Sequence, residues 1–133
     1  MPKVFLIEDV LELSRLYERV FRLSGFAVEL SGNGAEALER LFRMSELPDV
    51  IVLDVMIPEV NGIDVLRKLK QDDRLAPVPV IVLTNSFAPE NEDLFRSLGA
   101  RMYLMKMDHE PSALVAKVNM CMTPVPPTAP LSA

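Results

Sequence analysis

The sequence predicts an α/β fold in which a parallel sheet is covered by helices on both faces. Short apolar runs rich in β-branched residues, such as residues 50–53 and 80–83, alternate with segments whose apolar residues recur at helical spacing. The connections between these segments are short and contain glycine, proline or asparagine. Strict alternation with short connections is typical of parallel strands joined by right-handed helical crossovers.

Five short apolar runs qualify as strands, and most of them stop at a polar residue. Carboxylates follow the first and third runs, a threonine follows the fourth, and a lysine follows the fifth. The predicted strands cover residues 3–7, 26–30, 50–53, 80–83 and 101–105.

The segments between and after the strands show apolar residues three or four apart, as amphipathic helices do. Gly25 and Gly99 stand where two of the helices end. Pro48 requires the second helix to end before it, and Pro89 and Pro111 stand at the starts of the last two. The apolar positions of the five predicted helices lie within residues 13–21, 35–42, 63–69, 94–98 and 114–122.

Five strands favour the flavodoxin-like sheet order 2-1-3-4-5, in which the first and third strands are neighbours at the switch point. Glu8, Asp9 and Asp54 are then expected to converge at the carboxyl ends of those two strands. Thr84 and Lys106 end the fourth and fifth strands and face the same crevice. A helix cap or a turn would explain one isolated aspartate. Five polar groups at one sheet edge indicate a shared site.

The length and composition indicate one globular domain. A chain of 133 residues fits a single core, and we assign the domain to residues 1–122. Residues 123–133 contain four prolines without apolar periodicity, so we expect an extended tail or the start of a linker there. The net charge of -5, without any Lys/Arg run, argues against direct nucleic-acid binding by this segment.

The same composition sets the expected environment. A single cysteine, Cys121, excludes an internal disulfide and a cysteine-based zinc site, and its helical setting predicts a core position. The amino terminus does not read as a signal peptide, and no run reaches the roughly 18 apolar residues of a membrane span. We therefore expect a soluble, cytoplasmic protein with no membrane contact.

Three carboxylates at one sheet edge repel one another, and keeping them ionised requires a cation. Mg²⁺ fits best, because it takes oxygen ligands and is commonly held by one or two carboxylates together with phosphate oxygens. Asp54 could then act as a nucleophile toward phosphorus and form an aspartyl phosphate. Such a transfer needs mostly positioning and charge neutralisation, which Lys106 and Thr84 could supply.

The ordered set of residues resembles, over roughly residues 3–122, the receiver domain of two-component response regulators. Each element alone is a weak signal, whereas the ordered set at successive strand ends is specific. The matching features are Glu8-Asp9 after the first strand, Asp54 with a D-x-x-x-P-x-x-x-G pattern that ends in Pro58 and Gly62, Thr84, and Lys106.

The resemblance implies a signalling switch rather than an enzyme, one that catalyses only its own phosphoryl transfer and dephosphorylation. A histidine kinase or histidine phosphotransfer protein would donate the phosphoryl group to Asp54. The roles it implies are direct Mg²⁺ ligation by Asp9, Asp54 and the main-chain carbonyl of Met56, water-mediated ligation by Glu8, a hydroxyl contact from Thr84, inward rotation of Tyr103, and a phosphate-binding cation at Lys106.

The resemblance also suggests where partners bind. Receiver domains commonly form dimers or contact effectors through the fifth strand and its two flanking helices, and here that strand is expected at a sheet edge. The side chains expected on this surface are Arg96, Arg101, Met102 and Tyr103. An uncharged sheet edge is a template for pairing unless something covers it.

Two departures limit the comparison. Met107 follows Lys106 where receiver domains usually carry a proline in a cis peptide, so we expect a trans bond or an altered loop there. Asn85 stands beside Thr84 where a small residue is common.

The main alternative is a degenerate receiver that acts as a phosphorylation-independent interaction module. A D-x-D phosphohydrolase is disfavoured because Met56 stands two residues after Asp54. A flavin carrier is excluded, because the segment after the first strand is acidic where a phosphate-binding loop is needed.

Overall fold

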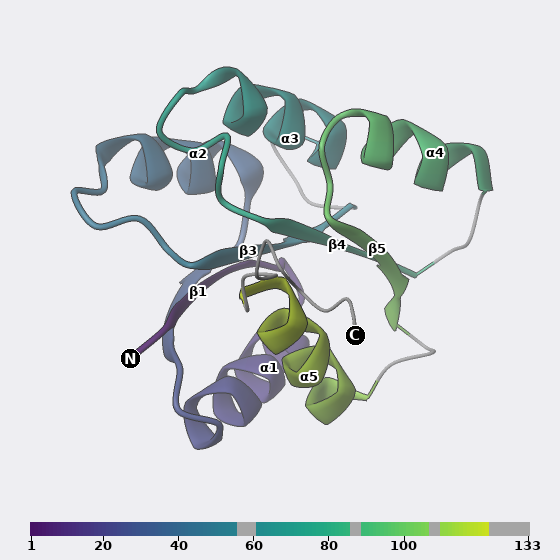
Figure 1. Ribbon diagram of the computed structural model, residues 1–133. Coiled ribbons are helices and arrows are strands. Elements are labelled where there is room, and N and C mark those ends of the chain that lie inside the picture. Colours follow the sequence, from purple (N-terminus) through teal and green to yellow (C-terminus); the bar gives the residue numbers. More distant parts are fainter. Residues whose placement is uncertain (56–60, 86–88, 107–109, 123–133) are drawn as a thin grey trace, which may run out of the picture.

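The chain folds around one five-stranded parallel sheet with the strand order β2-β1-β3-β4-β5 (Figure 1). The structure, a computed structural model, describes residues 1–55, 61–85, 89–106 and 110–122. The strands are β1 (Lys3–Ile7), β2 (Ala27–Ser31), β3 (Val50–Asp54), β4 (Val80–Thr84) and β5 (Met102–Met105). The order predicted from the sequence is confirmed.

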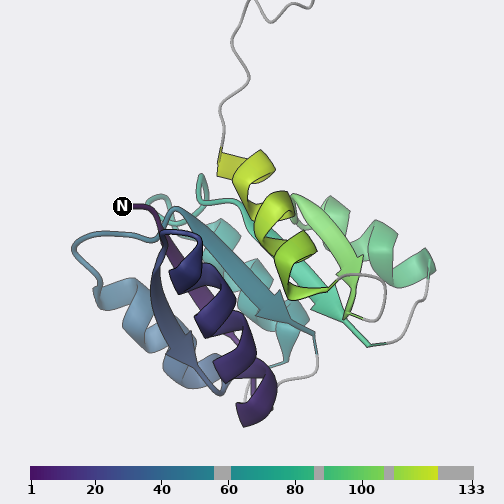
Figure 2. The same cartoon turned by 90° about the horizontal axis from the view of Figure 1, so that it is seen from below.

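Five helices alternate with the strands and cover both faces of the sheet. Helices α2, α3 and α4 lie on one face, and α1 and α5 lie on the other (Figures 1 and 2). Their bounds are α1 (Leu11–Leu23), α2 (Gly34–Arg43), α3 (Gly62–Gln71), α4 (Pro89–Ser97) and α5 (Pro111–Met122).

The two faces of the sheet bury two separate apolar clusters, because alternate strand residues point to opposite faces. In β1, Phe5 and Ile7 pack with the α2, α3 and α4 side, whereas Val4 and Leu6 pack with the α1 and α5 side. All residues of β3 and β4 are buried. These two buried strands end in Asp54 and Thr84.

The first β-α boundaries differ from the predicted ones by about one residue. Phe26 was expected to begin the second strand, but its N–H donates to the Phe21 carbonyl and its ring packs edge-on against Phe21 at 5.2 Å. It therefore completes the end of α1, where Gly25 has the positive φ of 93° that glycine tolerates. Asn33, in the connection between β2 and α2, caps α2 by accepting a hydrogen bond from the Glu36 N–H.

The last elements follow the prediction closely. Cys121 is buried with the other inward residues of α5, as expected, and Met122 is only partly buried. Gly99 has a φ of 110° at the end of α4. Arg101 precedes β5 but already donates its N–H to the Val80 carbonyl. No helix in the described ranges is long and apolar enough to cross a bilayer.

A reciprocal pair of hydrogen bonds fixes the start of β1 against the start of β3. The Lys3 N–H donates to the Asp49 carboxylate at 2.8 Å, and the Asp49 N–H donates to the Lys3 carbonyl at 2.8 Å. Beyond this pair the strands run in parallel register, from Val4 opposite Val50 to Ile7 opposite Leu53. The next residues along the two strands are Glu8 and Asp54.

Candidate functional site

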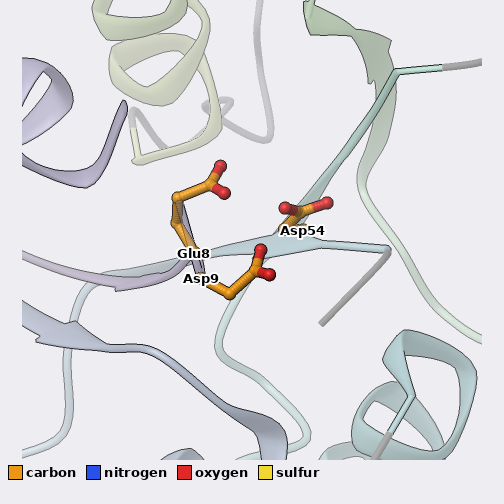
Figure 3. Close-up of side chains that lie close together, drawn as sticks. All are labelled: Glu8, Asp9 and Asp54. Atoms are coloured by element: carbon orange, nitrogen blue, oxygen red, sulfur yellow. The ribbon is translucent and has the colours of Figure 1, made fainter. Parts of the chain in front are cut away.

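Three carboxylates meet where β1 and β3 end. Glu8 and Asp9 follow β1, and Asp54 is the last residue of β3 (Figure 3). One oxygen from each side chain lies within 4.8 Å of the others. Glu8 and Asp54 are buried and Asp9 is exposed. The sequence therefore predicted this convergence correctly, since the carboxyl ends of neighbouring parallel strands share one edge.

Lys106 enters the same cluster from the end of β5. Its ammonium nitrogen lies 2.6 Å from Oε1 of Glu8 and 3.0 Å from Oδ2 of Asp54. The other Glu8 oxygen, Oε2, accepts the Val10 N–H at 3.1 Å. All three charged side chains in these pairs are almost fully buried. Lys106 thus supplies part of the positive charge that the carboxylates require.

The burial of these groups changes their protonation. Removal from water raises the pKa of Glu8 from 4.5 to about 7; the hydrogen bond from Lys106 opposes this rise and the charge of Asp54 adds to it. Burial alone would lower the pKa of Lys106, but its hydrogen bonds to Glu8 and Asp54 raise it above the ordinary value. The charged form of Lys106 is therefore favoured, whereas the pKa of Glu8 lies near neutral pH.

The donor set suits a hard divalent cation. All three converging side chains offer carboxylate oxygens, which Mg²⁺ and Mn²⁺ prefer. Burial is the largest cause of the raised pKa of Glu8, and the charge of Asp54 adds to it beyond what the bond from Lys106 offsets. An additional cation at this position would relieve the remaining repulsion. Met56, whose carbonyl the family resemblance assigns to the metal, lies outside the described residues.

The other predicted site residues lie on the strands beside the carboxylates. Thr84 is buried at the end of β4, next to β3 in the sheet. Tyr103 is buried within β5, and its ring centroid lies 5.5 Å from that of Phe95. Tyr103 thus points inward in this structure and does not belong to the outer surface on which we expected it. Met107, the departure after Lys106, lies outside the described residues.

A shallow pocket that was not predicted from the sequence lies beside the carboxylates. The pocket has a volume of about 210 Å³ between α1 and the β2–α2 connection. Ser14 of α1 lines it, and Ser31 donates to Glu36 at 2.6 Å on its far wall. Only the helical spacing that turns Ser14 toward the sheet could have indicated it. Its lining residues are Glu8, Asp9, Leu11, Ser14, Leu30, Ser31, Gly32 and Glu36.

The family model of the response regulator receiver domain matches residues 4–119. The chain belongs to this family. The resemblance seen in the sequence is therefore confirmed, and the fold and the acidic site are those of a receiver domain in two-component signal transduction.

Two curated relatives show how much of a protein this receiver domain spans. It is 37% identical to the transcriptional regulatory protein CpxR homolog of Haemophilus influenzae, over 77% of this chain and 40% of that protein. It is 35% identical to the polar-differentiation response regulator DivK of Brucella anthropi, over 80% of this chain and 85% of that protein. The chain thus spans less than half of one relative and most of the other.

Solved structures agree with the fold. A putative response regulator from Chloroflexus aurantiacus matches with a TM-score of 0.83 and 26% identity, over 92% of this chain and 98% of that one. The BeF3-activated N-terminal receiver domain of Klebsiella pneumoniae RstA matches with a TM-score of 0.82 and 25% identity, over 92% and 99% of the two chains.

Proposed function

We propose that this receiver domain is a phosphoacceptor, and that Asp54 receives a phosphoryl group from a phosphohistidine on a histidine kinase or a histidine phosphotransfer protein. The observation that carries the proposal is the meeting of three carboxylates and one buried lysine at the ends of β1, β3 and β5. Neither a helix cap nor a turn requires that combination.

The transfer exchanges one bond to phosphorus for another. A carboxylate oxygen of Asp54 forms the new O–P bond while the N–P bond to the donor imidazole breaks. The electron pair of that bond stays on the imidazole nitrogen. The other ring nitrogen carries the single proton, so the donor leaves as a neutral histidine. The attacking oxygen lies beside the Lys106 ammonium, whose nitrogen is 3.0 Å from Oδ2 of Asp54.

Mg²⁺ is the proposed cofactor, held by Asp9 and Asp54 directly, with Glu8 acting through water and the Met56 carbonyl as a further ligand. When bound, it would neutralise the carboxylates and the incoming phosphoryl oxygens. The all-oxygen cluster of Glu8, Asp9 and Asp54 supports this assignment.

The remaining site residues have proposed roles after transfer. Lys106 moves its hydrogen bond from Asp54 to a phosphoryl oxygen, a charge-assisted contact that is strong where water is excluded. The Thr84 hydroxyl contacts a second phosphoryl oxygen. Tyr103 is the switch residue that responds to the movement of Thr84, and its burial in β5 next to β4 supports such a coupling.

The output of the switch is a protein contact. We assign the partner surface to α4, β5 and α5, where a homodimer or an effector would bind, without direct nucleic-acid or membrane contact by this segment. Residues 1–122 form the receiver domain in this proposal, residues 123–133 form a tail or the start of a linker, and the protein works in the cytoplasm as a switch rather than as an enzyme acting on other substrates.

Exposure to acetyl phosphate with Mg²⁺ tests the proposal directly. The P–O bond to the acetyl group breaks, acetate leaves, and intact-mass measurement is expected to show one added phosphoryl group. The addition is expected to be lost in Asp54→Asn and kept in Asp49→Asn. Asp49 is a matched control because it immediately precedes β3, at the end opposite to Asp54.

A degenerate receiver gives a different result. If the wild-type mass stays unchanged while an established receiver domain is modified in the same tube, the chain is a phosphorylation-independent interaction module. If Asp49→Asn also abolishes the modification, the effect of Asp54→Asn cannot be assigned to the loss of the acceptor.

A further inference from the structure

The outer edge of the sheet at β2 carries backbone carbonyls that face away from β1. The Ala27 N–H donates to the Pro2 carbonyl, and the Ser31 carbonyl accepts from the Glu8 N–H, so the odd-numbered residues of β2 face β1. Successive residues of a strand point their backbone groups to opposite sides. The carbonyls of Val28 and Leu30 therefore lie on the outer edge, because β2 is the terminal strand.

Arg22, in the last turn of α1, covers the first of these carbonyls. Its Nη2 donates to the Val28 oxygen at 3.3 Å, and its Nε donates to Glu18 at 3.0 Å. The side chain is 53% exposed, so the contact lies at the surface of the molecule. The planar fork of the guanidinium allows both bonds at once.

Arg40 of α2 covers the second carbonyl from the opposite face of the sheet. Its Nη1 donates to the Leu30 oxygen and its Nη2 donates to the carboxylate of Glu29 on the same strand. The guanidinium carbon also lies 5.1 Å above the centre of the Phe5 ring, a cation–π contact that holds the side chain in place.

We propose that Arg22 and Arg40 close the β2 edge against strand addition by a second copy of this chain. A strand that pairs with an exposed edge must donate its N–H groups to the outward carbonyls. Here both acceptors already have charged donors, one from a helix on each face (Figure 1). The approaching copy would also meet two guanidinium groups at the edge.

The other edge of the sheet, along β5, has no such arginine contacts within the described ranges. The Arg101 N–H donates to Val80 of β4, so Met102 and Leu104 face outward by the same alternation. Among the described side chains, none donates to either of their carbonyls. The two edges therefore differ, and the closed β2 edge directs pairing between copies toward the side of β5.

The double variant Arg22→Gln/Arg40→Gln tests the proposal by sedimentation equilibrium without Mg²⁺ or phosphodonor. Its self-association is expected to tighten by roughly tenfold or more relative to wild type, as freeing two edge acceptors implies. Arg67→Gln is the matched control and is expected to behave as wild type. Arg67 of α3 is 52% exposed and its Nη1 lies 3.8 Å from an Asp64 oxygen, so it is paired within its own helix and away from both sheet edges.

The position of the new contact is read from amide NMR signals at increasing protein concentration. Signals of β2 are expected to shift or broaden in the double variant, and those of β5 to stay as in wild type. A folded double variant that associates no more than wild type, or that associates without change at β2, overturns the proposal. If the double variant does not fold, Arg22→Gln alone is measured in the same way, since it leaves the contact of Arg40 with Phe5 intact.

Discussion

Lys106 donates to Glu8 at 2.6 Å, although the two residues are 98 positions apart in the chain. The sequence alone suggests that Lys106 serves a phosphoryl oxygen, whereas the structure shows it first as the counter-ion of a buried carboxylate. The lysine and the proposed metal therefore share one cluster of negative charge. Removal of either cation is expected to change the affinity of the cluster for the other.

Replacement of Lys106 by alanine separates these roles. Without Mg²⁺, we expect the free energy of unfolding to fall by roughly 3 kcal/mol. This value is near the low end for a broken buried ion pair, because Glu8 can take up a proton and so lose its unpaired charge. Mg²⁺ affinity is expected to stay equal or to rise, and the response to beryllofluoride to be lost. Calorimetric titration measures the affinities for Mg²⁺ and for beryllofluoride, and the substitution Lys68→Ala at an exposed lysine is the control. Equal losses of both affinities would mean that Lys106 only maintains the fold.

The pKa of Glu8, about 7 instead of 4.5, predicts a pH dependence. Because the folded state holds a proton that the unfolded state releases, the contribution of Glu8 to metal-free stability is fully present below pH 4.5 and is lost as the pH rises to about 7. Mg²⁺ requires the ionised carboxylate, so its apparent affinity is expected to rise with pH and to level off above about pH 7.

Calorimetry in buffers of different ionisation enthalpy measures the protons released on Mg²⁺ binding. Release of roughly one proton is expected near pH 6 and almost none near pH 8. Glu8→Gln is the control and is expected to remove the release. Proton release that persists in Glu8→Gln would assign the titration to another group.

Gly62 is expected to tolerate no side chain. A Cβ there would meet backbone atoms of β3 and the residue after it, with Val55 Cα at 3.0 Å and the Asp54 oxygen at 3.3 Å. Gly62→Ala is expected to lower the free energy of unfolding by about 1–3 kcal/mol and to slow phosphorylation, because α3 must move away from Asp54. Gly32→Ala, with no atom within 4 Å of the new carbon, is the control. Chemical denaturation that finds the two variants equally stable would contradict this expectation.

The buried hydroxyl of Tyr103 leads us to expect that its removal stabilises the protein. Its hydroxyl is buried without a hydrogen-bond partner among the described residues. Tyr103→Phe removes that group and keeps the ring contact with Phe95, so we expect the free energy of unfolding to rise by about 1 kcal/mol. Tyr103→Leu, which loses the ring, is expected to lower it by about 2 kcal/mol or more. Thermal unfolding measures both, and a destabilised Tyr103→Phe would reveal a partner for the hydroxyl.

The proposed partner surface predicts an effect of charge reversal on α4. Arg96→Glu is expected to weaken association that beryllofluoride promotes, because Arg96 is half exposed beside β5. Arg67→Glu on α3, where the arginine is 52% exposed, is the control. Met102 is less suitable for this test because it is half-buried against the α1 and α5 cluster. Sedimentation that shows equal effects of both reversals would place the contact elsewhere.

The sequence predicted the strands, helices and sheet order because each has a local signal: apolar periodicity, glycine and proline positions, and short connections. It also predicted the meeting of Glu8, Asp9 and Asp54, which follows from topology alone. It did not predict the bond from Lys106 to Glu8 or the contacts of Arg22 and Arg40 with the β2 carbonyls, because these depend on the reach and rotamers of long side chains. Tyr103 was expected on the partner surface but is buried, because alternation along a short edge strand does not show that helices cover both of its faces.

The reciprocal bonds between Lys3 and Asp49 fix the register of β1 against β3, and this register determines where the site carboxylates lie. Glu8 lies five residues beyond Lys3, and Asp54 lies five residues beyond Asp49, so the two carboxylates are level because the two strands are equally long. One residue inserted in either strand would advance one carboxylate by roughly 3.3 Å and turn its side chain to the other face of the sheet. The spacing of the charged groups is thus set at the far end of the molecule, by backbone length rather than by contacts at the site.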